Sequence, residues 1–153
     1  MPTDVKPPQG RFGVALVEIA LVLPLVLAIV GGIVEFGRAI SLQQTVEDAA
    51  RFGARLAARP DADESATRTA ISSYLVENAG VESGRAELTI TVEPAAGHPA
   101  ADTLKASRPK DLVRVTIRLP YSEAGWWAGQ FVQGVTLTAS HECRRESPAE
   151  SPL

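Results

Sequence analysis

The sequence predicts an α+β protein with a long N-terminal transmembrane and stalk helix, a second short helix, and a small antiparallel sheet of about three strands. Three observations predict this class. Residues 14–34 form a run of 21 residues with one ionisable group, and a helical pattern of apolar residues continues to residue 58. Three segments with strand-like alternation then follow between residues 87 and 140.

The composition of the chain excludes some classes of function. Charged residues make up 22% of the 153 residues and the net charge is −3, with no basic block that would indicate a nucleic-acid partner. Cys143 is the single cysteine, so the chain cannot form an intramolecular disulfide. A lone cysteine of this kind is typical of a small buried hydrophobic side chain, although an intermolecular bridge stays open.

Glu18 is the one ionisable residue in the apolar run. Residues 19–34 are free of charge and span only about 24 Å as a helix, whereas a start at Val14 gives about 31 Å, close to the hydrocarbon thickness of a membrane. The longer helix places Glu18 one turn inside the membrane, where a charge costs about 3 kcal/mol. The carboxylate therefore needs a partner.

Three simpler interpretations compete for this segment. A cleaved secretory signal peptide is disfavoured because the apolar run is too long and lacks a cleavage site between small residues. A buried helix of a soluble core is disfavoured because the segment is apolar on all sides in a small domain. A plain membrane anchor that tolerates Glu18 near the boundary stays open.

Gly13 suggests a more specific interpretation. A cut between Gly13 and Val14 would free an α-amino group and make Glu18 the fifth residue of the mature chain. In a bundle of such helices, the amine of one subunit could pair with Glu18 of its neighbour and give the buried carboxylate a charged partner. Glu18 would then set the register of assembly.

These residues resemble the cleavage signal of type IV prepilins and pseudopilins. The following segment is similar to the TadE-like minor pseudopilins of the Tad (tight adherence) or Flp pilus assembly system. The similarity rests on residues 15–18, Pro24, 35–38, 49–51 and 53–55. The resemblance implies processing by a prepilin peptidase, and partners among other pilins, pseudopilins and inner-membrane Tad assembly proteins. It also implies a single-pass cell-membrane protein with a cytoplasmic N-terminus and an extracytoplasmic C-terminal domain.

The apolar helix contains three residues that are unusual in a soluble helix. Pro24 removes one backbone hydrogen bond and predicts a kink, which neighbouring helices can compensate in a membrane. Gly31 and Gly32 would allow another backbone to approach closely. All three are also found in ordinary membrane helices.

The helix is predicted to continue to Arg59 and Pro60, with a length of about 65 Å from Val14. It must therefore protrude from the membrane or pack on its own domain. Asp63 and Glu64 begin a short amphipathic second helix, and Gly80 is its expected C-terminal stop.

The three predicted strands each have one apolar face. The apolar positions are Leu88, Ile90 and Val92; Val113, Val115, Ile117 and Leu119; and Val135, Leu137 and Ala139. Residues 94–111 are rich in proline and alanine and are predicted to form an exposed flexible loop. With the resemblance, the predicted organisation is a prepilin-type leader (1–13), a transmembrane helix (14–34), a helical stalk continuation (35–59), an extracytoplasmic α+β domain (61–146) and a disordered tail (147–153).

No group of residues predicts catalysis, a metal site or a cofactor. His141 and Cys143 share a strand face, but two ligands do not make a metal site and His98 lies in the predicted loop. We expect a structural protein, not an enzyme. Trp126, Trp127 and Phe131 could form a contact surface for a partner or cap the small core.

Two other functions stay open at this point. An unprocessed single-pass protein could carry an extracytoplasmic binding or sensing domain, and the intact N-terminus would identify it. A membrane-tethered hydrolase would require a convergent histidine and nucleophile, which the sequence does not predict.

Overall fold

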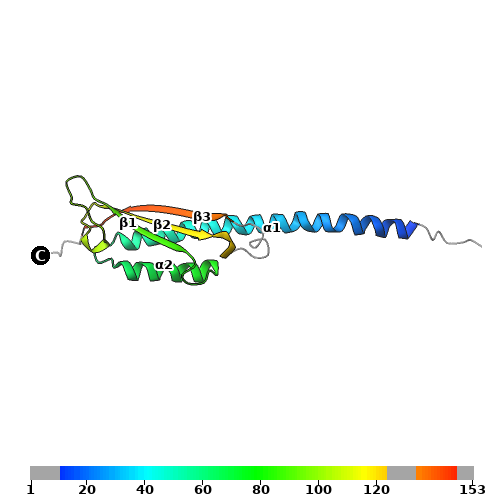
Figure 1. The fold of residues 1–153 in the computed structure, drawn as a ribbon, viewed down its shortest axis with the longest axis horizontal. Coiled ribbons are helices and arrows are strands. Elements are labelled where there is room, and N and C mark those ends of the chain that lie inside the picture. Colours follow the sequence, from blue (N-terminus) through cyan, green and yellow to red (C-terminus); the bar gives the residue numbers. More distant parts are fainter. Residues whose placement is uncertain (1–10, 124–133, 148–153) are drawn as a thin grey trace, which may run out of the picture. The chain divides into compact units, whose positions relative to one another are not determined.

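The computed structural model describes residues 11–123 and 134–147. Its elements are α1 (Arg11–Ala57), α2 (Glu64–Ala79), β1 (Glu87–Glu93), η1 (Leu104–Ala106), β2 (Leu112–Pro120), η2 (Tyr121–Glu123) and β3 (Thr136–Arg144) (Figure 1). The predicted α+β class is therefore confirmed. The chain divides into two units, residues 1–37 and 38–153, so that α1 contributes residues to both. We refer to residues 38–147 as the folded unit.

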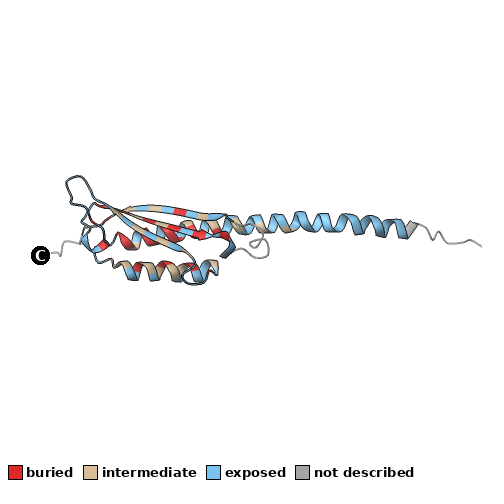
Figure 2. Ribbon diagram, in the orientation of Figure 1, coloured by how far each residue is buried: buried red, intermediate tan, exposed pale blue. Residues whose placement is uncertain are grey.

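The C-terminal part of α1 belongs to the core of the folded unit. Its buried residues recur at steps of three and four and are mostly alanine: Leu42, Val46, Ala49, Ala50, Ala54 and Ala57. Figure 2 shows these buried positions, and it shows that most residues of α1 before Gly37 are exposed. Of the two possibilities left by the sequence, residues 42–57 thus pack on their own domain. The small side chains let the sheet and α2 approach the helix closely.

Helix α2 begins and ends where the sequence predicts. The Asp63 carboxylate caps the N-terminus by accepting a hydrogen bond from the Ala66 amide at 3.1 Å. Gly80 ends the helix with φ of 66°, a left-handed conformation that favours glycine. The buried face of α2 consists of Thr67, Ile71 and Leu75.

The sheet is an antiparallel meander in the order β1-β2-β3. Its inner face includes Val113, Val115, Ile117 and Leu119 of β2, all fully buried. On β1 and β3 the inward residues are half-buried apart from Ala139, because these strands lie at the edges. Val135, which we predicted on the inner face, precedes β3 and is 46% exposed.

The outer face of the sheet is polar, and its charges are paired across the strands. The Arg114 guanidinium contacts Glu142 at 2.7 Å and Glu93 at 3.0 Å, so one cation on the central strand joins both edge strands. Thr116 and Ser140 hydrogen bond in the neighbouring row at 3.1 Å. Such exposed cross-strand pairs each contribute a fraction of a kcal/mol and fix the register of the strands.

A side chain from a helix contacts each edge strand. The Arg68 guanidinium of α2 donates to the main-chain oxygen of Leu88 on β1 at 2.6 Å, and Glu64 holds the same guanidinium at 2.9 Å. On the other edge, the Gln43 amide of α1 donates to the Thr138 oxygen on β3 at 3.3 Å. These contacts satisfy one exposed carbonyl on each edge.

The segment from residue 94 to residue 111 differs from the prediction. Ala101 and Leu104 are buried, the latter 1% exposed as the first residue of η1, so the prediction of an exposed loop is wrong for this part. Because the segment is rich in alanine and proline, its sequence did not indicate that Leu104 would be buried. The loop is therefore attached to the core.

Candidate functional site

The predicted cleavage bond lies in the first turn of α1. The helix begins at Arg11, so the Gly13–Val14 peptide belongs to the turn whose amides have no partner within a helix. A Cβ atom added to Gly13 would meet no atom within 4 Å. Glycine costs about 1 kcal/mol in a helix relative to alanine, and nothing in the described structure requires it at this position.

Glu18 lies one turn after the predicted cleavage bond, with its side chain exposed. It shares a shallow hollow on the side of α1 with Gly13, Val14, Val17 and Leu21. Among the described residues, Glu18 has no hydrogen bond or ion pair. The structure thus brings Gly13, Val14 and Glu18 to one face and leaves the carboxylate available to another molecule.

The other residues singled out in the apolar helix are also in place. Pro24 lies inside α1, and the helix continues on both sides of it. Gly32 is exposed and a Cβ atom there would meet nothing within 4 Å, while Gly31 is half-buried. Within Gly13–Ala57, one stretch is apolar and long enough to cross a membrane, and the protein buries none of it.

The aromatic residues proposed as a contact surface, Trp126, Trp127 and Phe131, lie outside the described residues. His141 and Cys143 lie on the inner side of β3, opposite Val115 and Val113, and both are half-buried. Within residues 11–123 and 134–147, no three histidine, cysteine, aspartate or glutamate side chains are grouped as a metal site would require.

Asp111 organises the segment before β2, a role that the sequence did not reveal. Its carboxylate is 1% exposed and accepts hydrogen bonds from the amides of Ala95 at 2.9 Å and Arg108 at 2.7 Å. The His98 ring contacts the same carboxylate through Nδ1 at 2.6 Å. Burial opposes ionisation of this group, but the hydrogen bonds from Arg108, Ala95 and His98 outweigh it and lower the pKa of Asp111 to about 2.

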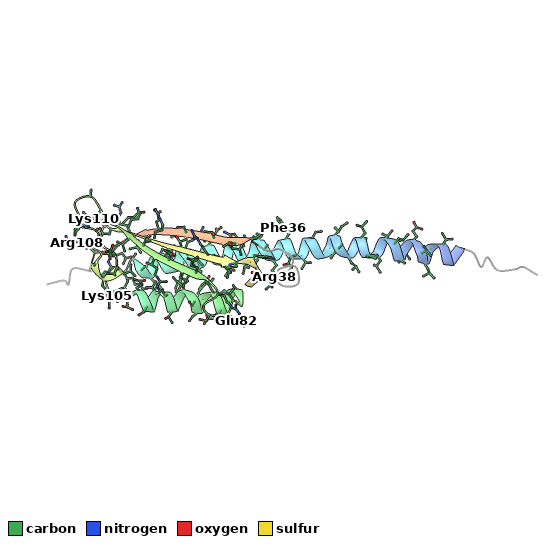
Figure 3. The ribbon with its side chains drawn as sticks, in the orientation of Figure 1. Phe36, Arg38, Glu82, Lys105, Arg108 and Lys110 are labelled. Atoms are coloured by element: carbon green, nitrogen blue, oxygen red, sulfur yellow. The ribbon has the colours of Figure 1, made fainter. Side chains whose placement is uncertain are left out.

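Asp63 is a second carboxylate whose pKa is lowered to about 2. The hydroxyl of Ser65, the amide of Ala66 and the ammonium of Lys105 stabilise its charged form. Lys105 comes from η1, so this cap also joins α2 to the segment that Asp111 holds. Lys105, Arg108 and Lys110 gather at one end of the folded unit, whereas Glu82 lies at its other end (Figure 3).

Arg145 is a buried cation that the sequence analysis also missed. The residue is 7% exposed, and its guanidinium donates hydrogen bonds to the main-chain oxygens of Ala57 and Pro60, both at 3.0 Å. A cation at the C-terminus of a helix satisfies free carbonyls and complements the helix dipole. A basic residue after a predicted strand was visible in the sequence, but its partner 88 positions earlier was not.

Helix α1 thus combines an exposed apolar stretch, a carboxylate without a partner among the described residues, and a C-terminal part that belongs to the folded unit. Residues 13–55 match the TadE-like protein family. The TadE-like segment covers the predicted cleavage bond, Glu18, the apolar stretch and most of α1 in the folded unit. This match suggests a membrane-associated protein of the Tad pilus, in agreement with the resemblance noted in the sequence. No curated protein and no solved structure matches the chain.

Proposed function

We propose that this chain is a minor pseudopilin of a Tad or Flp type pilus or secretion apparatus. The TadE-like match and the apolar helix support this proposal. A prepilin peptidase would cut the precursor between Gly13 and Val14, with the N-terminus on the cytoplasmic side and the folded unit outside the cytoplasm. The role is assembly by packing, and the chain is the substrate of an enzyme instead of a catalyst.

The observation that carries the proposal is the pair formed by Glu18 and Gly13. Glu18 is a carboxylate in an apolar helix without a partner among the described residues, and a charge in such a segment indicates a functional contact. Gly13 is a glycine that the fold does not require. Cleavage after Gly13 would supply the positive charge that Glu18 lacks, on the N-terminus of an adjacent subunit.

The N-terminus of the membrane-extracted protein tests this proposal. In cells with an active prepilin peptidase, mass spectrometry should find a chain that begins at Val14. The variant Gly13→Leu should accumulate as the intact precursor, because a Cβ atom added at this position meets nothing in the fold, whereas the leucine side chain would obstruct a peptidase that requires glycine. The matched variant Gly32→Leu should be processed normally.

An intact N-terminus in the parent protein would contradict the proposal and favour a permanently anchored binding or sensing domain. Normal processing of Gly13→Leu would show that the peptidase does not recognise Gly13. Because neither substitution touches the folded unit, changes in its stability do not complicate the result.

A further inference from the structure

The sheet has two edges, one along β1 and one along β3 (Figure 1). In an antiparallel sheet, the main-chain groups of every second residue on an edge strand point away from the sheet. Gln43 bonds the Thr138 carbonyl and Arg68 bonds the Leu88 carbonyl from outside the sheet, so both carbonyls point outward. The other outward main-chain groups, without a hydrogen bond in the described part of the chain, are those of Ser140 and Glu142 on β3 and of Ile90 and Val92 on β1.

Both edges also leave inner-face side chains partly uncovered. The inner-face side chains of β2 are fully buried, whereas three on each edge strand are only half-buried. A strand added to either edge would therefore gain main-chain hydrogen bonds and bury apolar surface at the same time. The half-buried side chains are Leu88, Ile90 and Val92 on β1, and Leu137, His141 and Cys143 on β3.

The two edges differ in which side chains accompany the outward main-chain groups. On β3 these residues, such as Ser140, place their side chains on the outer face, whereas on β1 they, such as Ile90, place them on the inner face. Antiparallel pairing sets outward residues opposite each other, so an edge keeps its faces aligned only with the same edge of another copy. Parallel pairing sets an outward residue opposite one that points away, so only β3 with β1 keeps the faces aligned.

The direction of the copies selects between these two pairings. Antiparallel pairing of identical edges turns the second copy end for end. β1 and β3 run in the same direction, because each is antiparallel to β2, so parallel pairing of β3 with β1 keeps both copies in one direction. Copies that are anchored in one membrane by the apolar part of α1 share one direction, and this step rests on the proposed function. Membrane anchoring therefore favours the pairing of β3 with β1.

The charges on the two edges favour one register. It sets Ser140 of one copy opposite Thr89 of the second copy, and four residues later in sequence it sets Arg144 opposite Glu93. Arg144 is exposed and has no ion pair in the described part of the chain, and Glu93 is 52% exposed. A shift by two residues in one direction would bring Glu142 against Glu93, which is unfavourable, and the opposite shift would separate Arg144 from Glu93.

A hollow of about 210 Å³ between α1 and β3 fits the same register. It is lined by Glu47, Arg51 and residues 138–141. In the second copy, the Arg68 guanidinium lies at the edge of β1, and the main-chain oxygen that it bonds would face this part of β3. The guanidinium would thus enter the hollow. Each copy brings one cation with its carboxylate, Arg51 with Glu47 and Arg68 with Glu64, so neither charge is in excess.

We propose that the β3 edge of one copy binds the β1 edge of a second copy of this chain in parallel, with Ser140 opposite Thr89. Each copy keeps its other edge free, so the contact repeats and joins copies into a row. The row gives the folded unit a subunit contact of its own, separate from the pairing proposed for Glu18.

Paired cysteines in the full chain, expressed in cells and carrying Cys143→Ala, test this contact. Ser140 and Thr89 are exposed on the outer face, and within one copy they lie on strands separated by β2, about 10 Å apart, which is too far for a disulfide. In the proposed pairing they lie on adjacent strands, about 5 Å apart. After mild oxidation, the double variant Ser140→Cys and Thr89→Cys should therefore give a ladder of disulfide-linked oligomers on a non-reducing gel.

The matched controls concern the edge and the register. Ser140→Cys alone should give no disulfide-linked dimer, because β3 does not pair with β3 of another copy. Thr91→Cys in place of Thr89→Cys should lose the ladder, because it lies two residues out of register. Arg144→Glu, added to the double variant, should lower the ladder yield about fivefold through repulsion from Glu93. Arg118→Glu, on the central strand, should leave the yield unchanged.

Four results would overturn the inference: no ladder from the double variant, a dimer from Ser140→Cys alone, an equal ladder with Thr91→Cys, or no effect of Arg144→Glu. The mature N-terminus, measured in the same cells, reports separately on the proposed function. A chain that begins at Val14 but forms no ladder would contradict this inference alone. A ladder from a chain with an intact N-terminus would support the contact and contradict the proposed processing.

Discussion

The guanidinium of Arg145 donates a hydrogen bond to the main-chain oxygen of Ala57 at 3.0 Å, across 88 positions of sequence. The amide of Arg145 donates at the same time to the oxygen of Asp111 at 2.7 Å, and the amide of Glu146 to the oxygen of Ala58 at 2.9 Å. The end of β3 is thus attached to the end of α1 and to the start of β2. Three segments distant in sequence meet at this residue.

Replacement of Arg145 by alanine should destabilise the folded unit by about 2–4 kcal/mol, because the buried carbonyl of Ala57 and the part-buried carbonyl of Pro60 would lose a charged donor. Arg145→Lys should lower the free energy of unfolding by about half as much, because one ammonium reaches both carbonyls less well than a guanidinium does. Urea unfolding of the full-length protein in detergent micelles, followed by circular dichroism, measures both. Equal stability of Arg145→Ala and the parent would show that water replaces the guanidinium at no cost.

Gly53→Ala should destabilise the folded unit by about 1–2 kcal/mol, although alanine is the better helix former. An added Cβ atom would overlap Cδ1 of Ile71 and lie 2.7 Å from its Cγ1. Ile71→Val, which deletes Cδ1, should recover part of the loss in the double variant. Gly37→Ala is the matched control, because a Cβ atom there meets nothing, and it should leave stability unchanged or raise it.

Acid should destabilise the folded unit between about pH 4 and pH 2. The pKa of Asp111 is lowered to about 2 in the folded state and lies near 3.9 when unfolded, so its contribution is complete above pH 4 and is lost as the pH falls through the folded value. Asp63 adds to the same window, because its pKa is also about 2. Measurement of the free energy of unfolding across this pH range gives its slope against pH and checks the prediction.

Asp111→Asn should lower stability by about 1–3 kcal/mol at pH 7, because an amide nitrogen cannot accept the hydrogen bond from Arg108. The difference in the free energy of unfolding between variant and parent should become smaller at pH 2, where the parent carboxylate is half protonated. A difference that stays constant from pH 7 to pH 2 would contradict the assigned pKa.

Glu18→Ala should reduce incorporation into the appendage without changing the stability of the folded unit. The Glu18 side chain is exposed and contacts no partner among the described residues, so its loss removes only a contact with another subunit. Glu18→Gln, which keeps size but not charge, should give an intermediate result. Quantification of the protein in sheared appendages measures this, and parent-level incorporation of the alanine variant would contradict the proposed pairing.

The sequence predicted the elements whose signals are local. Asp63 and Gly80 mark the ends of α2 because a cap and a left-handed glycine act within one turn, and the alternation of Val113 to Leu119 marks β2 because one face is buried. Glu18 and Gly13 stay a predicted site, chosen because a charge and a glycine are anomalous in an apolar helix.

The features that were missed depend on contacts distant in sequence. Asp111 and Arg145 are ordinary charged residues until the fold buries them, and Leu104 became an anchor only because the loop passes over the core. The Trp126 and Trp127 surface stays a prediction.

The contacts of Arg145 also affect the order in which the chain can fold. Translation delivers residues in sequence, and α1 emerges long before the side chain that satisfies its last carbonyls. The strand that completes the sheet, β3, is also the last of the described elements to appear. A nascent chain that has not reached residue 145 therefore lacks both, and the folded unit closes only after this residue is added, so premature termination before residue 145 should leave an open species for quality-control proteases.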